Sequence, residues 1–240
     1  MANPYFDFKQ FRLTQNKQVF KLSTDSVLLG AWAKSEKTTH ILDIGTGTGI
    51  LALMTAQRFP DAQIDAIDID ADAVQCATFN FEQSKWNDRL QIHHSSLHNF
   101  FPKEPSGYDL IISNPPYFQN QFVSPYEKKR RFKHTEELSY ESLFFYADKF
   151  CSATGTFALI LPADVDILPV ALENHFFLCR KTVVLVRPQK SPKRILWQFS
   201  RKDGSVDFST ITIHDLPTGT RYSDAYKQLT GTFYLEEKFL

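Results

Sequence analysis

The segment Asn114-Pro115-Pro116-Tyr117 places an amide side chain, two prolines and an aromatic ring directly after a predicted strand over 108–113. A planar exocyclic amine carries two N–H donors, so two fixed acceptors can hold it and aim its nitrogen at an electrophilic methyl group. The side-chain carbonyl of Asn114 and the backbone carbonyl of Pro115 are suitable acceptors. Prolines add no competing N–H and fix φ, and Tyr117 can stack on a planar base. The segment predicts methyl transfer to an amine, although an Asn-Pro-Pro turn can also be only a rigid loop.

A glycine-rich segment, residues 43–49 (DIGTGTG), joins a predicted strand over 41–45 to a predicted helix over 50–58. Glycines permit a tight turn and let a ligand approach the free N–H groups at a helix start. Asp68 ends the next predicted strand, where an acid can accept both hydroxyls of a ribose. These features predict a site for an adenosine-type cofactor, with a purely structural turn as the alternative.

The residues around the glycines narrow the choice of cofactor. Ile50 and Leu51 stand where a phosphate-binding Walker A loop requires Lys and Ser or Thr. Ile50 also fills the third glycine position of the dinucleotide fingerprint, so that fingerprint fits poorly. Asp43, directly before the loop, suits a cationic ligand such as S-adenosylmethionine (SAM) better than an anionic pyrophosphate. The pattern favours SAM and leaves a dinucleotide as the alternative.

The charge of the chain is balanced overall but unevenly distributed. Its 240 residues include 27 Lys and Arg, 27 Asp and Glu, and 42% hydrophobic residues, which is typical of a globular protein. Two basic runs lie at 127–133 and 187–202. Each can be a solvated face, but two such runs in a neutral chain favour a polyanionic partner, because phosphates are bound mainly by Lys and Arg.

Other composition features exclude several classes of protein. Three cysteines lie far apart without a CxxC pattern, which predicts neither a disulfide framework nor a cysteine zinc site. His93 and His94 are adjacent on a predicted strand and point to opposite faces, so we expect no metal site. The first residues lack the basic and apolar regions of a leader peptide, so we expect none, and the sequence has no stretch of ~20 apolar residues. We expect a cytoplasmic protein that associates with no membrane and has no obligate protein partner.

Predicted strands and helices alternate along most of the chain. Short apolar or alternating runs predict strands at 41–45, 63–68, 89–94, 108–113, 156–161, 182–187, 194–200 and 206–213. Helices are predicted at 24–34, 50–58, 71–85, 139–151, 164–175 and 222–230. This order predicts an α/β fold with a doubly wound, mostly parallel sheet. We expect one domain over 1–240, with an N-terminal helical cover (about 1–38) and a basic loop insertion (about 117–138).

DIGTGTG, Asp68 and NPPY (114–117) together resemble the motifs of class I SAM-dependent amino-methyltransferases, which have a Rossmann-like fold. More specifically, nearly the whole chain is similar to the bacterial tRNA1(Val) (adenine-N6)-methyltransferases. This narrower resemblance is carried by FRLTQNKQVFKLSTDSVLLGAWA (11–33), NPPYF (114–118), RRFKHTEELSYESL (130–143) and RPQKSPKRILWQF (187–199). It implies methyl transfer from SAM to N6 of the adenine just 3′ of the anticodon of a valine tRNA.

The residues and the resemblance together predict three groups of site residues. The catalytic group is Asn114, Pro115, Pro116 and Tyr117. The cofactor-binding group is Thr24, Asp43, Gly45, Thr46, Gly47, Asp68, Ile69, Ser96 and Asn114. The group predicted to bind the tRNA substrate is Lys128, Lys129, Arg130, Arg131, His134, Arg187, Lys190, Lys193 and Arg194.

Two positions depart from the pattern of the family. Ser23 stands where the family usually has Gly, and Ser96 stands where the third strand normally ends with an Asp that accepts from the cofactor adenine amine. A serine accepts a weaker hydrogen bond than a carboxylate does. We therefore expect weaker SAM affinity rather than a different cofactor.

Three other functions are compatible with parts of the sequence. NPPY also occurs in enzymes that methylate a glutamine amide or other nucleic-acid amines, so a protein glutamine N-methyltransferase is the main alternative. The basic runs favour an RNA substrate over a protein one. An RNA-binding protein that has lost catalysis is compatible with Ser96 in place of the usual Asp, but the intact NPPY argues against it. A dehydrogenase is disfavoured because no acid or base near the glycine loop supports it.

Overall fold

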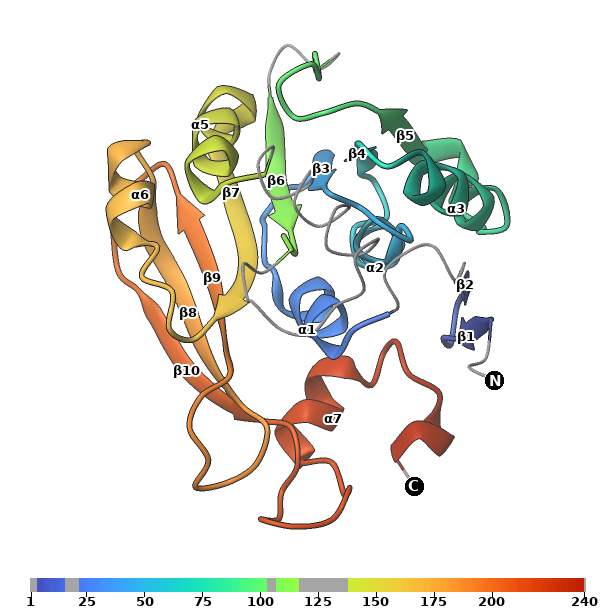
Figure 1. Ribbon diagram of the computed structural model, residues 1–240, viewed down its shortest axis with the longest axis vertical. Coiled ribbons are helices and arrows are strands. Elements are labelled where there is room, and N and C mark those ends of the chain that lie inside the picture. The colour runs from blue at the N-terminus through green and yellow to red at the C-terminus, as the bar shows by residue number, and fades with distance from the viewer. Residues whose placement is uncertain (1–3, 16–21, 103–106, 117–137, 240) are drawn as a thin grey trace, which may run out of the picture.

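The computed structural model describes residues 4–15, 22–102, 107–116 and 138–239, and its centre is a twisted sheet with helices on both faces (Figure 1). The strand order in this sheet is β10-β8-β9-β7-β6-β3-β4-β5. All neighbouring pairs are parallel except the two made by β9, which is antiparallel to β7 and to β8. The predicted doubly wound, mostly parallel sheet is confirmed.

The strands of the sheet end close to the predicted positions in most cases. They are β3 (His40–Ile44), β4 (Gln63–Asp68), β5 (Leu90–His94), β6 (Tyr108–Ser113), β7 (Cys151–Pro162), β8 (Phe177–Leu185), β9 (Arg194–Ser200) and β10 (Asp207–Thr212). The helices are α1 (Thr24–Trp32), α2 (Ile50–Arg58), α3 (Ala71–Glu82), α5 (Tyr140–Phe150), α6 (Leu168–Glu173) and α7 (Asp224–Thr230), with short 3-10 turns η1 (Asn87–Arg89) and η2 (Glu236–Phe239). None in the described part of the chain is long and apolar enough to span a bilayer.

Two apolar cores lie on opposite faces of the sheet, because successive side chains of a strand point to opposite faces. On β3, Ile41 belongs to the core that α1, α2 and α7 cover, and Leu42 belongs to the core that α5 and α6 cover. Both residues are fully buried. Because both faces of the sheet are buried, its parallel strands have nearly continuous apolar sequences.

Two strand boundaries differ from the prediction. β8 begins at Phe177 rather than near 182. Its first half carries two cations, which hide the strand pattern in the sequence. The structure shows why they are tolerated: the Arg180 guanidinium lies 4.4 Å from the Trp32 ring centroid and Lys181 Nζ lies 4.3 Å from that of Trp197, distances at which a cation is attracted to an aromatic face. The other difference is β7, which begins directly after α5 and is longer than predicted.

The N-terminal segment contains a β-hairpin that the helical cover predicted for residues 1–38 did not include. Its strands are β1 (Tyr5–Asp7) and β2 (Arg12–Thr14), which pair antiparallel. Phe8 stacks on Phe11, with ring centroids 4.6 Å apart, and on Tyr234 near the C-terminus, at 5.7 Å. Stacked aromatic side chains bury large apolar surfaces. The backbone joins the two segments as well, because Phe8 forms an isolated antiparallel bridge with Tyr234 and the Lys9 N–H donates to the Phe233 carbonyl (2.7 Å).

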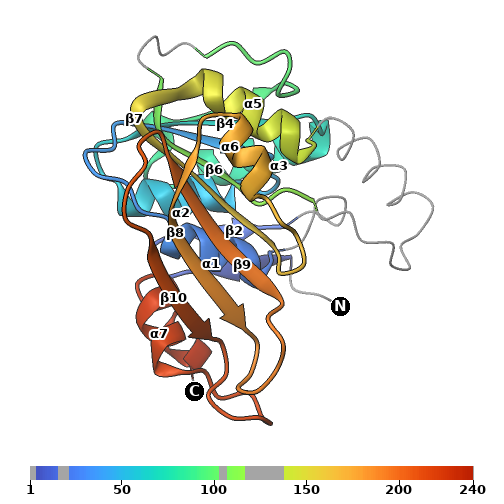
Figure 2. The same ribbon diagram turned by 90° about the vertical axis from the view of Figure 1, so that its left-hand side faces the viewer.

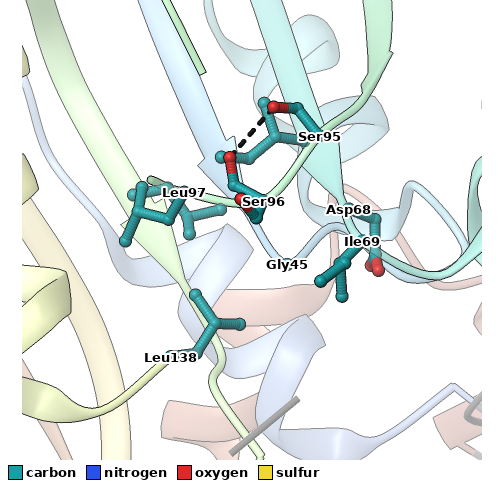
Figure 3. A pocket seen from close by; sticks show the side chains of 9 residues that line it. Gly45, Asp68, Ile69, Ser95, Ser96, Leu97 and Leu138 are labelled. Atoms are coloured by element: carbon teal, nitrogen blue, oxygen red, sulfur yellow. Dashed lines mark hydrogen bonds between the residues drawn. The ribbon is translucent and has the colours of Figure 1, made fainter. Parts of the chain in front are cut away.

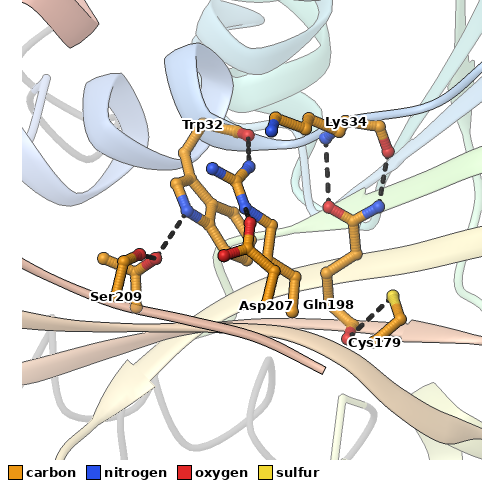
Figure 4. A network of polar contacts seen from close by, with 8 residues as sticks. Trp32, Lys34, Cys179, Gln198, Asp207 and Ser209 are labelled. Carbon is orange, nitrogen blue, oxygen red and sulfur yellow. Dashed lines mark hydrogen bonds and ion pairs between the residues drawn. The ribbon is translucent and has the colours of Figure 1, made fainter. Parts of the chain in front are cut away.

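The end of α1 is fastened to the antiparallel part of the sheet by a polar network (Figure 4). The Trp32 indole N–H donates to Thr182 Oγ1 (2.8 Å), and Arg180 Nη1 donates to the Trp32 carbonyl (2.6 Å). Gln198 accepts from the backbone N–H of Lys34 (3.0 Å). The last carbonyls of a helix lack partners within the helix, and here side chains of β8 and β9 supply partners. Figure 2 shows the same strands, with β10, extending away from α3 and α5.

Candidate functional site

The predicted motifs follow four adjacent strands and meet at one edge of the sheet. In the sheet order β6-β3-β4-β5, Asn114 follows β6, the glycine loop 45–49 follows β3, Asp68 ends β4, and residues 95–97 follow β5. Ser113 pairs with Ile44 in register, and the Ser113 hydroxyl donates to the Ile44 carbonyl (2.9 Å). In sheets of this kind, ligands bind beyond the carboxyl ends of the strands where the strand order reverses. This carboxyl edge is the candidate site.

The glycine loop has the backbone geometry that its sequence predicts. Gly45, Gly47 and Gly49 all have positive φ, at 72°, 58° and 82°, a region that residues with a Cβ rarely adopt. Gly49 has a second constraint, because a Cβ there would lie 2.5 Å from the Phe81 ring of α3. At Gly47 a Cβ would meet nothing among the described residues within 4 Å. Gly47 therefore faces open space, while Gly49 sets the packing of the loop on α3.

Asp43 lies underneath the glycine loop. Its side chain is 0% exposed, and its Oδ2 accepts from the Thr46 hydroxyl (2.5 Å) and from the Ala52 backbone N–H (3.2 Å). Its Oδ1 is buried and has no hydrogen-bond partner among the described residues. Burial raises the pKa of Asp43 to about 7, although these two hydrogen bonds favour the carboxylate. Asp43 and Thr46 thus fasten the loop to the start of α2 from beneath.

Asp68 holds the other side of the same loop. Its Oδ2 accepts from the Gly47 N–H (2.8 Å) and its Oδ1 from the Asp70 N–H (2.9 Å), and 5% of the residue is exposed. Each carboxylate oxygen can accept a further hydrogen bond. Asp68 is therefore oriented by the backbone at the point where the sequence predicted an acceptor for ribose hydroxyls.

A pocket opens beside Asp68 between the ends of β4 and β5 (Figure 3). Ile69, Leu97 and Leu138 give it apolar walls, and Ser95 and Ser96 bring hydroxyl groups to it. The Ser95 hydroxyl donates to the Ser96 carbonyl (2.9 Å). An apolar slot with a few polar groups suits a flat heterocycle next to a ribose. The structure brings Gly45, Asp68, Ile69 and Ser96 of the predicted cofactor group together here.

Asn114 lies on the far side of the glycine loop from this pocket, next to the start of α1. Asn114 Nδ2 donates to the Ser26 hydroxyl oxygen (2.9 Å) in the first turn of α1. Pro115 is buried and Pro116 is half-buried. Thr24, predicted to bind the cofactor, is the exposed first residue of α1. Tyr117 lies outside the described residues.

The predicted substrate-binding residues fall into two sets. Lys128, Lys129, Arg130, Arg131 and His134 lie outside the described residues. Arg187, Lys190 and Lys193 lie in the segment between β8 and β9, and Arg194 begins β9. Because β9 is antiparallel to both β8 and β7, and β7 is parallel to β6, the carboxyl end of β8 lies at the same edge of the sheet as the site.

The structure gives Arg194 a partner within the fold. Arg194 Nε donates to Asp25 Oδ2 (2.8 Å), which ties the start of β9 to the start of α1, and both side chains are largely covered. Lys190 and Lys193 are exposed. In the register of the sheet, Leu159 of β7 is level with Ser113 at the end of β6. Arg194 pairs with Pro162, which lies three residues further along β7. At about 3.3 Å per residue, this basic segment rises roughly 10 Å beyond the end of β6.

Several residues of the edge were missed by sequence reasoning. Ser95 and Leu97 flank the predicted Ser96, so the end of β5 was the available signal. Leu138 and Ser26 lie within the segments 130–143 and 11–33 that carry the family resemblance, but that resemblance assigned neither of them a role in the site. His93 contacts Asp65 and His94 contacts the Ile69 carbonyl. Among the described residues, no three His, Cys, Asp or Glu side chains are grouped so as to hold a metal ion.

Comparison with known proteins shows the family of the chain. Residues 15–159 match the family described as methyltransferase small domain. A Bacteroides thetaiotaomicron protein named tRNA1(Val) (adenine(37)-N6)-methyltransferase is 38% identical over 242 residues, covering 99% of this chain and 100% of that protein. A protein of the same name from Aliivibrio fischeri is 42% identical over 233 residues, with coverages of 96% and 97%.

A solved structure gives the same result for the fold. A predicted O-methyltransferase from Agrobacterium tumefaciens matches with a TM-score of 0.69 over 87% of this chain and 96% of that one, at 16% identity. An identity this low speaks for the fold alone. The fold is the Rossmann-like class I methyltransferase fold.

Proposed function

Because this chain belongs to the methyltransferase small domain family, and within it to the family of tRNA1(Val) (adenine(37)-N6)-methyltransferases, we propose that it methylates N6 of an adenine in tRNA with SAM as donor. The target we propose is the adenine 3′ of the anticodon of tRNA1(Val). The observation that carries the proposal is the position of Asn114 and Pro115, which follow β6 directly beside the glycine loop of β3.

The residues of the pocket fit SAM. A carboxylate at Asp68 suits ribose hydroxyls, and the walls formed by Ile69, Leu97 and Leu138 suit an adenine ring. Open space at Gly47 lets a ligand lie against the loop backbone. When bound, SAM supplies an electrophilic methyl carbon on a sulfonium, which becomes a neutral thioether as the new N–C bond forms.

Asn114 and Pro115 hold the acceptor amine in this proposal. The exocyclic amine of adenine donates one N–H to the Asn114 side-chain carbonyl and the other to the Pro115 backbone carbonyl. Pro115 is buried and has a restricted φ, and the Asn114 amide is held by its hydrogen bond to Ser26. They direct the nitrogen at the methyl carbon, and the amine releases one proton to water after transfer. Positioning accounts for most of the rate enhancement, so no general base is required.

The basic segment between β8 and β9 supplies phosphate contacts in this proposal. Exposed Lys190 and Lys193 rise roughly 10 Å beyond the end of β6, where the backbone of an RNA loop would lie while one of its bases enters the site. The basic run 127–133 adds further charge in the sequence directly after NPPY. An anticodon loop already has splayed bases, so extracting one adenine costs less than it would in a duplex.

The test is methyl transfer from labelled SAM to an unmodified tRNA1(Val) transcript, followed by nucleoside analysis. The expected product is N6-methyladenosine at the position 3′ of the anticodon, and none in a matched transcript with guanine there. Measurable SAM binding without transfer to tRNA would overturn the proposal. Transfer instead to a glutamine-containing peptide from a release factor, or to another nucleic-acid amine, would identify the substrate.

A further inference from the structure

The start of α1 carries a serine pair that the motifs of the site do not explain. Ser23 is the N-cap of α1, and its Oγ accepts from the Ser26 backbone N–H (3.1 Å). The two hydroxyl oxygens are also 3.1 Å apart. A capping serine needs only the first of these contacts to stabilise a helix start. The second contact links the cap to the Ser26 hydroxyl, which also accepts from Asn114 Nδ2 (2.9 Å).

An asparagine amide has a donor end and an acceptor end of nearly the same shape. Only the carbonyl end can accept an N–H of a substrate amine. A hydroxyl group alone does not distinguish the two ends, because it can either donate or accept. The Ser26 hydroxyl is directed by its neighbour: when its hydrogen goes to Ser23 Oγ, its lone pairs remain for the Asn114 amide N–H. The Asn114 carbonyl oxygen is then directed away from Ser26.

We propose that Ser26 is a positioning residue for methyl transfer, whose hydroxyl, oriented by Ser23, sets which end of the Asn114 amide meets the acceptor amine. This inference rests on the proposed amino-methyltransferase function and assigns a residue that acts through Asn114. Ser26 is 8% exposed, so water competes little for the hydrogen bond to Asn114. The relay joins α1 to the loop after β6, which are 88 positions apart in the sequence.

The chain contains a matched control for this relay. Ser139 caps α5 in the same way, with its Oγ accepting from the Ser142 N–H (3.1 Å) and lying 3.2 Å from the Ser142 hydroxyl. Two helices of the chain thus begin with an S-x-x-S sequence, at residues 23–26 and 139–142. Ser26→Ala and Ser142→Ala remove the same hydroxyl from the same kind of cap, but only the first removes the partner of Asn114.

The experiment measures single-turnover methylation of the tRNA1(Val) transcript at saturating SAM and tRNA, together with the Kd for SAM and the melting temperature. We expect Ser26→Ala to slow the methyl-transfer step by roughly three- to tenfold, the value of one hydrogen bond, with unchanged Kd for SAM and KM for tRNA. Ser142→Ala is expected to keep the wild-type rate. Ser26→Thr, which retains the hydroxyl, is expected to recover most of the rate.

A second substitution separates orientation from folding. In Asn114→Asp the two ends of the side chain are equivalent acceptors, so Ser26→Ala added to that background is expected to cost nothing further in the transfer rate. A Ser26→Ala rate within twofold of that of Ser142→Ala would overturn the inference. Absence of N6-methyladenosine with the wild-type protein would instead overturn the proposed function, so the two failures are distinguishable.

Discussion

At one end of the carboxyl edge, side chains hold backbone that lies close to them in the sequence, whereas at the other end they join distant segments. We call the first the cofactor end (residues 43–49, 68–69 and 95–97) and the second the amine end (114–116 with the starts of α1 and β9). At the cofactor end, Asp43 bonds to a residue nine positions away and Asp68 to one 21 positions away. At the amine end, the Asn114–Ser26 contact spans 88 positions and the Asp25–Arg194 contact spans 169.

This difference separates two requirements of the reaction. The cofactor end is assembled when three adjacent strands pair, because its side chains bond mainly to the loop backbone itself. The amine end is assembled only when α1 and β9 are both in place, since Asp25 of α1 bonds to Arg194 and Ser26 of α1 bonds to Asn114. We therefore expect changes at the cofactor end to alter ligand affinity and loop stability, and changes at the amine end to alter the rate of transfer.

Asn114→Ala gives the largest expected effect and tests this separation directly. Removing the acceptor for the substrate amine is expected to lower kcat by about 100-fold or more, because the nitrogen is no longer aimed at the methyl group. The Kd for SAM, measured by calorimetry, is expected to stay near the wild-type value. Asn114→Asp, which keeps an acceptor, is the control and is expected to retain more activity. Near-normal turnover of Asn114→Ala would show that the amine is not held in this way.

The separation also explains what could be predicted from the sequence. The glycine loop, Asp68 and NPPY were identified because each is a short run at the end of a strand, and pairing of parallel strands brings such ends together. Their placement at one edge follows from the strand order. The roles assigned to these residues remain predictions, and Asp43 shows the limit of the approach, because its position beneath the loop is a matter of packing.

The elements that the sequence did not reveal depend on tertiary contacts. Ser26, Leu138, Asp25 and Arg194 lie in segments that resemble the family, and Arg194 was predicted to bind substrate, but the contacts they make at the site appear only in the folded chain. The early start of β8 was hidden by cations that lie over tryptophan rings. The β1–β2 hairpin was missed because its three-residue strands pair only with each other and are fastened by aromatic packing.

Asp68→Asn is expected to act at the cofactor end and to have the next largest effect. Hydrogen bonds to charged groups contribute about 1.5–3 kcal/mol, so the Kd for SAM should rise roughly 10- to 100-fold. At saturating SAM, kcat should fall far less than in Asn114→Ala. Asp70→Asn removes a nearby negative charge but keeps a capping side chain for α3, and it is expected to leave the Kd within about twofold. Equal losses in both variants would indicate a general charge effect instead of a specific contact.

The double substitution Lys190→Ala/Lys193→Ala extends the comparison from the amine end to its basic rim. Each lost phosphate contact lowers the dependence of binding on salt, so the slope of log Kd for tRNA against log salt should decrease by about 1 to 2. The KM for tRNA should rise several-fold with an unchanged Kd for SAM. Lys34 and Lys37 lie in the loop between α1 and β3, at the opposite edge of the sheet, so Lys34→Ala/Lys37→Ala is the control. An unchanged salt slope in the Lys190→Ala/Lys193→Ala variant would show that the RNA phosphates contact other residues.

Asp43→Asn has the smallest expected effect and concerns the support of the loop rather than the ligand. Burial raises the pKa of Asp43 to about 7, above its value in an unfolded chain, so the folded protein binds this proton more tightly than the unfolded chain does. The stabilisation from this group is fully present below pH 4 and is lost as the pH rises to about 7. Relative to Asp43→Asn, the free energy of unfolding of the wild type should therefore decrease across this range, by at most about 1.4 kcal/mol per pH unit.

Asp109 provides a control of opposite sign for this measurement. Burial alone would raise the pKa of Asp109, but hydrogen bonds from the Thr39 backbone and hydroxyl and from the His40 backbone together lower it. Its stabilisation is present above its unfolded pKa and is lost as the pH falls. In urea titrations the Asp43→Asn difference from wild type should change between pH 4 and 7, whereas the Asp109→Asn difference should stay nearly constant there and change, in the opposite direction, only as the pH falls below the ordinary aspartate pKa of 3.8. A flat difference for Asp43→Asn would mean that Asp43 is already ionised in the folded loop, and its charge would then be available to a cationic ligand at the cofactor end.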